Sequence, residues 1–149
     1  MFERFSDGAR KLMGAARNLA LLSGSDWIRS EHIVLACLSD EAFGAVRLLK
    51  HLGVDPAKIR AAVEGVIPGG TGKPTLGQMP FSPDSKKLIE GAAAAALELK
   101  HADIATGHFL VADLGNPTGV LRQVLPRLEM EPLLLRTRIT EVLSKLEWL

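Results

Sequence analysis

Apolar residues recur along the chain at spacings of three and four, which is the pattern of amphipathic helices. The first stripe comprises Leu12, Ala15, Ala16, Leu19 and Leu22. Ser6 precedes this stripe at a position suited to a helix N-cap. The pattern therefore predicts a helix from Ser6 to about Leu22 with one buried face.

Three more helices are predicted in the first half of the chain. The expected starts are Ser30 for the second helix, Asp40-Glu41 for the third and Asp55-Pro56 for the fourth. Gly53 is suited to end the third helix, since glycine tolerates the left-handed conformation that often follows a helix. Proline directly after a capping carboxylate is typical of a first helical position.

The second half repeats this plan. A shift of 76 residues aligns positions 2–67 with 78–143 without a gap, and 16 of the pairs are identical. The matching starts are Ser82-Pro83, Thr106, Asn116-Pro117 and Glu131-Pro132. We therefore predict an all-α fold of eight helices in two tandem four-helix repeats, 1–67 and 81–146. The glycine- and proline-rich residues 68–80 are predicted to be a linker. We expect the two repeats together to form one compact domain.

The inward positions of these stripes predict the hydrophobic core. In the first repeat the predicted core residues are Leu12, Leu19, Ile33, Leu38, Leu49, Ile59 and Val63. In the second they are Leu88, Phe109, Leu114, Leu125, Leu135 and Ile139. Alanine and leucine dominate the composition and tyrosine is absent, which favours helices over sheets.

Composition excludes several classes of protein. With 18 Lys and Arg against 17 Asp and Glu, the net charge is +1, so a basic nucleic-acid-binding surface is not expected. A single cysteine cannot form an internal disulfide. The apolar run from Gly91 to Leu97 is too short to cross a membrane, and the charged N-terminus does not resemble a signal peptide. A cytoplasmic protein is the expectation.

No catalytic or metal-binding arrangement stands out. The segment from Gly69 to Lys73 lacks the strand, spacing and helix of a phosphate-binding loop. His32 and His108 have no further ligands at helical spacing, so a structural role is favoured. Cys37 falls on an inward face and is expected to act as a small buried hydrophobe. We expect neither a cofactor nor a metal, and no enzyme activity.

The helix starts offer a different chemistry. Ser6 and Glu31 each lie at or beside a helix N-terminus, where free backbone N–H groups attract anions. A hydroxyl and these amides suit a phosphate, and a carboxylate suits a guanidinium. Plain helix capping explains the same residues, since such caps occur on most helices.

Several motifs resemble the N-terminal domain of ClpC- and ClpA-type ATPases. They are Met1-Phe2-Glu3-Arg4-Phe5-Ser6-Asp7, Ile28-Arg29-Ser30-Glu31-His32-Ile33-Val34-Leu35, Leu52-Gly53-Val54-Asp55 and Pro80-Phe81-Ser82-Pro83-Asp84-Ser85-Lys86-Lys87-Leu88-Ile89-Glu90. The resemblance covers about residues 1 to 145. It implies two repeats related by a pseudo-twofold axis, which bind adaptor proteins and protein substrates for a Clp unfoldase ring or protease.

The resemblance also implies particular sites. A phosphoarginine pocket is expected at Ser6 and Glu31, and a second at Ser82 and residue 107. Gly107 stands where the family has glutamate, which puts the second pocket in doubt. The surface that receives adaptors in relatives corresponds to Phe2, Arg10, Phe81, Lys86 and Glu90.

Three functions remain open at this stage. The first is a substrate- or adaptor-recognition module of a Clp unfoldase, non-enzymatic and expected to be monomeric in isolation. The second is a stand-alone accessory protein that docks on a Clp complex and regulates it. The third is an enzyme whose active-site residues are distant in the sequence and come together only in the folded chain. A reading frame that continues into an ATPase would favour the first, and a stop codon after Leu149 would favour the second.

Overall fold

A computed structural model describes residues 2–69 and 79–145, and within these residues the regular structure is helical. The elements in chain order are the 3-10 helix η1 (Phe2–Arg4), α1 (Asp7–Leu22), α2 (Ser30–Cys37), α3 (Gly44–His51), α4 (Pro56–Glu64), α5 (Pro83–Glu98), α6 (Thr106–Gly115), α7 (Val120–Val124), the 3-10 helix η2 (Leu125–Leu128) and α8 (Pro132–Leu143). The predicted all-α fold is confirmed.

The helices of the second half start 76 positions after those of the first. This offset relates α1 to α5, α2 to α6, α3 to α7 and α4 to α8. The duplication seen in the sequence is therefore a duplication of structure. The main difference lies in the third pair, because α7 ends at Val124 and continues as η2, whereas α3 is a single helix.

Four predicted N-caps are confirmed. Ser6 Oγ accepts from the N–H of Ala9, and Ser82 Oγ accepts from the N–H of Ser85. The carboxylates of Asp55 and Glu131 cap α4 and α8 in the same way, each followed by proline. These caps satisfy backbone donors that would otherwise lack a partner at the helix start.

The other predicted starts are shifted. Ser30 and Thr106 are the first residues of their helices rather than N-caps. The third helices begin at Gly44 and Val120, after turns in which the side chains of Asp40 and Asn116 accept from the backbone two residues on. A short polar side chain closes such a turn as readily as it caps a helix, so the sequence alone did not separate the two.

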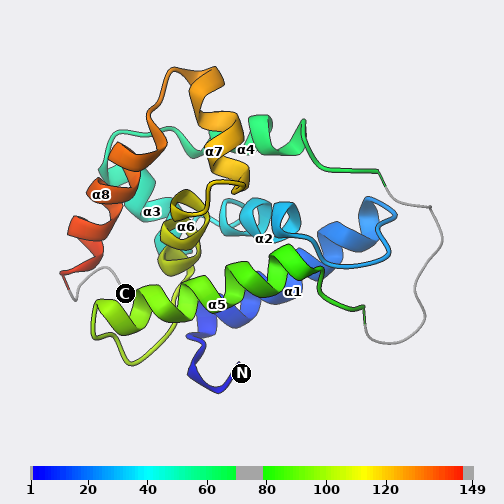
Figure 1. Cartoon of the computed structure of the whole chain (residues 1–149), viewed down its shortest axis with the longest axis horizontal. Helices are drawn as coiled ribbons and strands as arrows, with labels where there is room; N and C mark the ends of the chain where they lie inside the picture. The colour runs from blue at the N-terminus through cyan, green and yellow to red at the C-terminus, as the bar shows by residue number, and fades with distance from the viewer. Residues whose placement is uncertain (1, 70–78, 146–149) are drawn as a thin grey trace.

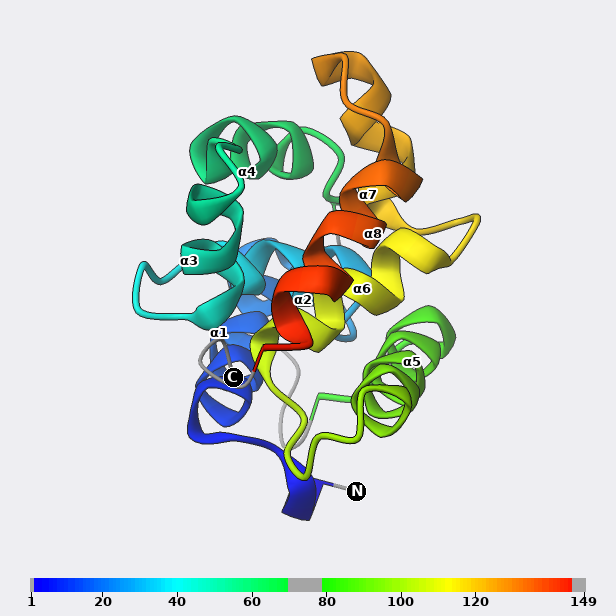
Figure 2. The same cartoon turned by 90° about the vertical axis from the view of Figure 1, so that its left-hand side faces the viewer.

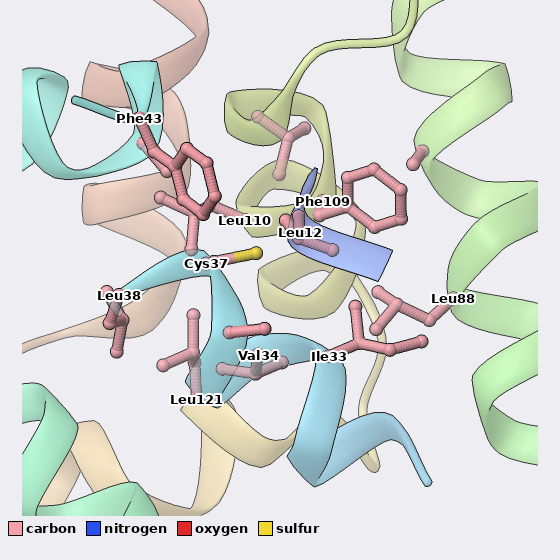
Figure 3. Close-up of a cluster of buried hydrophobic side chains, with 14 of the residues drawn as sticks. Leu12, Ile33, Val34, Cys37, Leu38, Phe43, Leu88, Phe109, Leu110 and Leu121 are labelled. Atoms are coloured by element: carbon pink, nitrogen blue, oxygen red, sulfur yellow. The ribbon is translucent and has the colours of Figure 1, made fainter. Parts of the chain in front are cut away.

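The helices form three levels (Figures 1 and 2). The related helices α2 and α6 pack against each other in the middle, α1 and α5 cover them on the side of the N-terminus, and α4 and α7 lie on the opposite side. The helices α3 and α8 lie at one end of the molecule, on the left in Figure 1. Figure 3 shows the core around α2 and α6, where Ile33 and Cys37 meet side chains of the second half.

Twelve of the thirteen predicted core residues are buried. The exception is Leu19, which is partly buried at the edge of the core. Residues 70–78 of the predicted linker lie outside the described residues. At its end, Met79 is buried and the carbonyl oxygen of Pro80 accepts from the N–H of Ile28, so this part of the segment is packed against the first repeat.

Candidate functional site

Each repeat begins with an extended residue that pairs with the other repeat. Phe5 forms a parallel bridge with Ile104, and Phe81 forms the equivalent bridge with Ile28. The N–H of Ser6 donates to the carbonyl oxygen of Ile104 over 3.0 Å, and the N–H of Ser82 donates to that of Ile28 over 2.9 Å. The start of α1 therefore lies beside the start of α6, and the start of α5 beside the start of α2.

This crossing corrects the pairing expected from the sequence. Ser82, not Ser6, lies beside the start of α2, where Glu31 is located. Ser6 instead lies beside Ile104, two residues before the start of α6. The sequence did not signal that the repeats exchange their first residues.

The start of α2 carries the polar features of a binding site. The Oε2 atom of Glu31 is buried and has no hydrogen-bond partner among the described residues. A buried carboxylate oxygen without a donor is costly, and it can accept from an incoming guanidinium. The hydroxyl of Ser30 donates to Oδ2 of Asp84 over 3.0 Å, from α2 to the first turn of α5. The carboxylate of Asp84 thus occupies the position from which a ligand phosphate would accept a hydrogen bond from the Ser30 hydroxyl.

Ser82 contributes to this site through the backbone. Its side chain is fully buried, and its Oγ accepts from the N–H of Ser85. The carbonyl oxygen of Ser82 in turn accepts from the hydroxyl of Ser85. The bond from the N–H of Ser82 to the carbonyl oxygen of Ile28 holds the start of α5 beside the start of α2, and the buried Ser82 hydroxyl is already used within α5.

The start of α6 is closed by contrast. Thr106 is buried, and its Oγ1 accepts from the N–H of Ala45 at the start of α3 over 2.9 Å. A Cβ at Gly107 would lie 3.0 Å from Cδ2 of Leu143, so the end of α8 fills the space beside it. Glycine at this position removes the carboxylate and also makes room for a leucine.

Two histidines stabilise the starts of α2 and α6 from within. The N–H of Arg29 donates to Nδ1 of His32, and the N–H of Ala105 donates to Nδ1 of His108. The other ring nitrogens bond to Ser23 Oγ at 3.1 Å and to His101 Nδ1 at 2.9 Å, respectively. The predicted structural role of both histidines is thereby confirmed.

Burial has the dominant effect on the titration of these histidines. Burial and, to a smaller extent, the charge of Arg29 lower the pKa of His32 to about 4. Burial likewise lowers the pKa of His108 to about 4, assisted by His101. Both rings are therefore neutral at physiological pH and act as fixed hydrogen-bonding groups.

Asp113 is a buried acid that the sequence analysis missed. Its Oδ1 accepts from the N–H of Val120 and its Oδ2 from the N–H of Leu121, so it caps α7 from α6. Burial raises its pKa to about 6 against the opposing effect of these two hydrogen bonds. Its equivalent in the first repeat is Cys37, which is buried as predicted, and burial raises the pKa of the thiol. The sequence did contain a signal for this residue, because the 76-residue alignment sets the charged Asp113 opposite Cys37, which was expected to be buried.

The predicted partner surface is exposed around the N-terminus. The ring of Phe2 is 42% exposed and lies 5.0 Å from that of Phe5 and 6.1 Å from that of Phe81, measured between centroids. The bridges described above bring these aromatic residues of both repeats together. Arg10 on α1 and Lys86 and Glu90 on α5 are exposed. Figure 2 shows α1 and α5 on either side of the N-terminal segment.

Two features are absent from the described residues. No helix there is long and apolar enough to cross a membrane. No group of three or more His, Cys, Asp or Glu side chains in that part of the chain is arranged to hold a metal ion.

Two intertwined four-helix repeats define the molecule as a duplicated helical domain. The family model described as the Clp repeat (R) N-terminal domain matches residues 4–125 and 80–148. The chain therefore belongs to this family, and the resemblance in its motifs is confirmed.

Similar proteins agree with this assignment. The chloroplastic chaperone protein ClpC of Pisum sativum is 30% identical over 145 residues, which are 97% of this chain and 16% of the relative. A ClpA homologue of Guillardia theta, an ATP-binding subunit of the ATP-dependent Clp protease, is 31% identical over 144 residues, 97% of this chain and 18% of the relative. The chain thus spans less than a fifth of these two proteins.

Solved structures share the fold. The N-terminal domain of Hsp104 from Candida albicans superposes with a TM-score of 0.79 at 19% identity, covering 96% of this chain and 94% of that one. The N-terminal domain of ClpD from Arabidopsis thaliana gives a TM-score of 0.70 at 23% identity and covers 97% of both chains.

Proposed function

We propose that this chain is a protein-recognition module of a Clp-type unfoldase, which binds adaptors and substrate proteins and performs no catalysis itself. Nearly the whole chain aligns with less than a fifth of the ClpC and ClpA relatives, which fits one module of a larger machine. A fold neighbour at a TM-score of 0.69 is a ClpV N-domain in complex with a VipB peptide. Peptide recognition by this fold supports a protein ligand for this chain as well.

The pair of the exposed Phe2 and the partly buried Phe81 carries the proposal. A half-exposed phenylalanine held against a second ring offers an apolar anchor, and the helices α1 and α5 that follow the two rings expose charges of both signs at Arg10, Lys86 and Glu90. Interfaces use such aromatic anchors with polar rims. The N-terminal surface is thus suited to segments that combine apolar and charged side chains.

Binding of fluorescently labelled casein, a protein without stable tertiary structure, tests this surface. Fluorescence anisotropy should show saturable binding by the full chain, and Phe2→Ala should weaken it about tenfold or more. Lys58→Ala, which changes an exposed residue on α4 far from Phe2 in the fold, is the matched control and should bind like the original chain. Equal binding by both variants would exclude this surface.

A finer proposal concerns the start of α2. The unpartnered Oε2 of Glu31 and the free amides of a helix start together suit a phosphorylated guanidinium group. We place this phosphoarginine-type site at Glu31, Ser30 and the first turn of α5. The start of α6, with Gly107 and Leu143, is proposed not to bind phosphoarginine.

The cellular compartment of the chain is proposed only in general terms. The relatives include chloroplastic proteins, so we propose a compartment that contains a Clp unfoldase, whether cytoplasmic or not.

A further inference from the structure

Two exposed leucines mark a surface on the side opposite Phe2. Leu133 and Leu134 in the first turn of α8 are 49% and 59% exposed. The equivalent positions in α4 hold Ala57 and Lys58, at the same place in the same fold. The architecture therefore does not require leucine here. Two neighbouring leucines facing solvent are explained better by a contact than by folding.

A shallow hollow lies beside Leu134. Its volume is about 200 Å³, and it is lined by Val54, Glu129, Met130, Glu131, Leu134, Leu135 and Arg138. Carboxylates stand at one end of the α8 segment and a guanidinium at the other. The surface is thus apolar in the middle with opposite charges at its two ends.

Glu131, Leu134 and Arg138 form one stripe along α8. They are spaced by three and four residues, so they share a face of the helix. Both oxygens of Glu131 accept from backbone N–H groups at the helix start and retain further lone pairs. Arg138 donates one N–H to the carbonyl oxygen of Leu52, which leaves other donors of its guanidinium available. Both ends of the stripe can take part in another ion pair.

We propose that this α8 patch (Glu131, Leu133, Leu134 and Arg138) binds the same patch of a second copy of the chain, with the two α8 helices antiparallel. Glu131 lies about 4.5 Å before Leu134 along the axis, and Arg138 about 6 Å after it. A twofold axis beside Leu134 therefore stacks Leu134 on Leu134 and sets each Glu131 opposite Arg138 of the second copy. The patch is complementary to itself in both charge and apolarity.

The contact is small. One short helix from each copy buries less than the roughly 1,200 Å² of a standard stable interface. We therefore expect weak pairing and a monomer in dilute solution. Pairing becomes significant where copies are held close together, because a high local concentration compensates for a low affinity.

Sedimentation equilibrium of the full chain from about 10 μM to about 1 mM tests the proposal. The expected result is a monomer–dimer equilibrium whose dissociation constant rises about tenfold or more in Leu134→Lys, which places the residue of the first repeat at this position. Leu97→Lys changes a leucine that is 68% exposed on α5 and is the matched control, with no change expected. A monomer at every concentration, or equal effects of both variants, would overturn the proposal.

A double-mutant cycle tests the charge pairing. Glu131→Gln keeps an oxygen to cap α8 but removes the charge, and Arg138→Gln removes the partner charge. If the two side chains pair across the twofold axis, the double variant should be no weaker than either single variant. Additive effects would exclude the antiparallel arrangement. Circular dichroism melts verify that each variant remains folded.

Discussion

The backbone N–H of Ser82 donates to the carbonyl oxygen of Ile28 over a distance of 2.9 Å, although 54 residues separate them. The same bond recurs between Ser6 and Ile104 at 3.0 Å. Each of the two positions where the sequence suggested a pocket therefore combines a helix start from one repeat with an N-capping serine from the other. The two sites differ because Glu31 faces one of them and Gly107 the other.

Calorimetry with free phosphoarginine should detect one site in each chain. Glu31→Gln should abolish binding, because the guanidinium loses its charged acceptor. Asp84→Asn should strengthen binding, because a carboxylate bonded to Ser30 repels the phosphate. Ser6→Ala is the control, since Ser6 lies beside α6, and it should leave the affinity unchanged. Two equivalent sites would refute this asymmetry.

Restoring the missing glutamate should not restore a site. Gly107→Glu pushes a side chain into Leu143, whose Cδ2 would lie 3.0 Å from the new Cβ. We expect a loss of stability of about 1–3 kcal/mol from overpacking and no second phosphoarginine site. Thermal melts and calorimetry on the same variant measure the two effects. A stable variant with a second site would show that the start of α6 is open.

The equivalent core leucines should be of similar importance. Leu38, the C-cap residue of α2, is equivalent to Leu114 in α6, and both are buried. Truncation of either to alanine should lower the free energy of unfolding by about 2–5 kcal/mol, because it leaves a cavity. Urea unfolding measures this loss. Leu22→Ala, which alters a leucine that is 86% exposed, is the control and should have little effect.

Asp113 should contribute to stability because it caps α7. Asp113→Ala leaves the N–H groups of Val120 and Leu121 without their acceptors in the core, which we expect to cost about 1–3 kcal/mol. Hydrogen exchange should then accelerate in α7 before it does in α5. Unchanged protection of Val120 and Leu121 would contradict the capping role.

Stability should fall as the pH drops from about 6.5 to about 4. Within this range the unfolded chain protonates His32 and His108, whereas the folded chain, with both pKa values near 4, does not. Asp113 acts oppositely, because its folded pKa of about 6 lets the folded chain take up a proton first. Two histidines outweigh one aspartate, so we expect a net loss of about 3 kcal/mol.

Melts across this pH range measure the loss. His32→Gln removes one of the two titrating rings, so its stability should depend less steeply on pH than that of the original chain. An unchanged slope would mean that His32 is protonated in the folded state.

The sequence predicted the helices, the duplication and nearly all of the core, because these follow from local periodicity and caps such as Ser6 and Asp55. It did not predict which helix starts meet. A 76-residue repeat is compatible with two separate bundles or with two that exchange their first residues, and the bridge from Phe5 to Ile104 leaves no periodic signal. The cap on α7 was missed for the same reason, since Asp113 lies three residues before Asn116, where the sequence marked the turn.

The exchange of Phe5 and Phe81 between the repeats has a consequence for the origin of the chain. Within one repeat the 16 residues of α1, about 24 Å of helix, separate the amide of Ser6 from the segment that leads to the carbonyl of Ile28, and each group bonds to the other repeat instead. Two unlinked copies would satisfy both by trading their first residues, which is the geometry of a swapped dimer. Gene duplication then converts a concentration-dependent assembly into one polypeptide. Once the halves share a chain, each is free to diverge, as Glu31 and Gly107 have done.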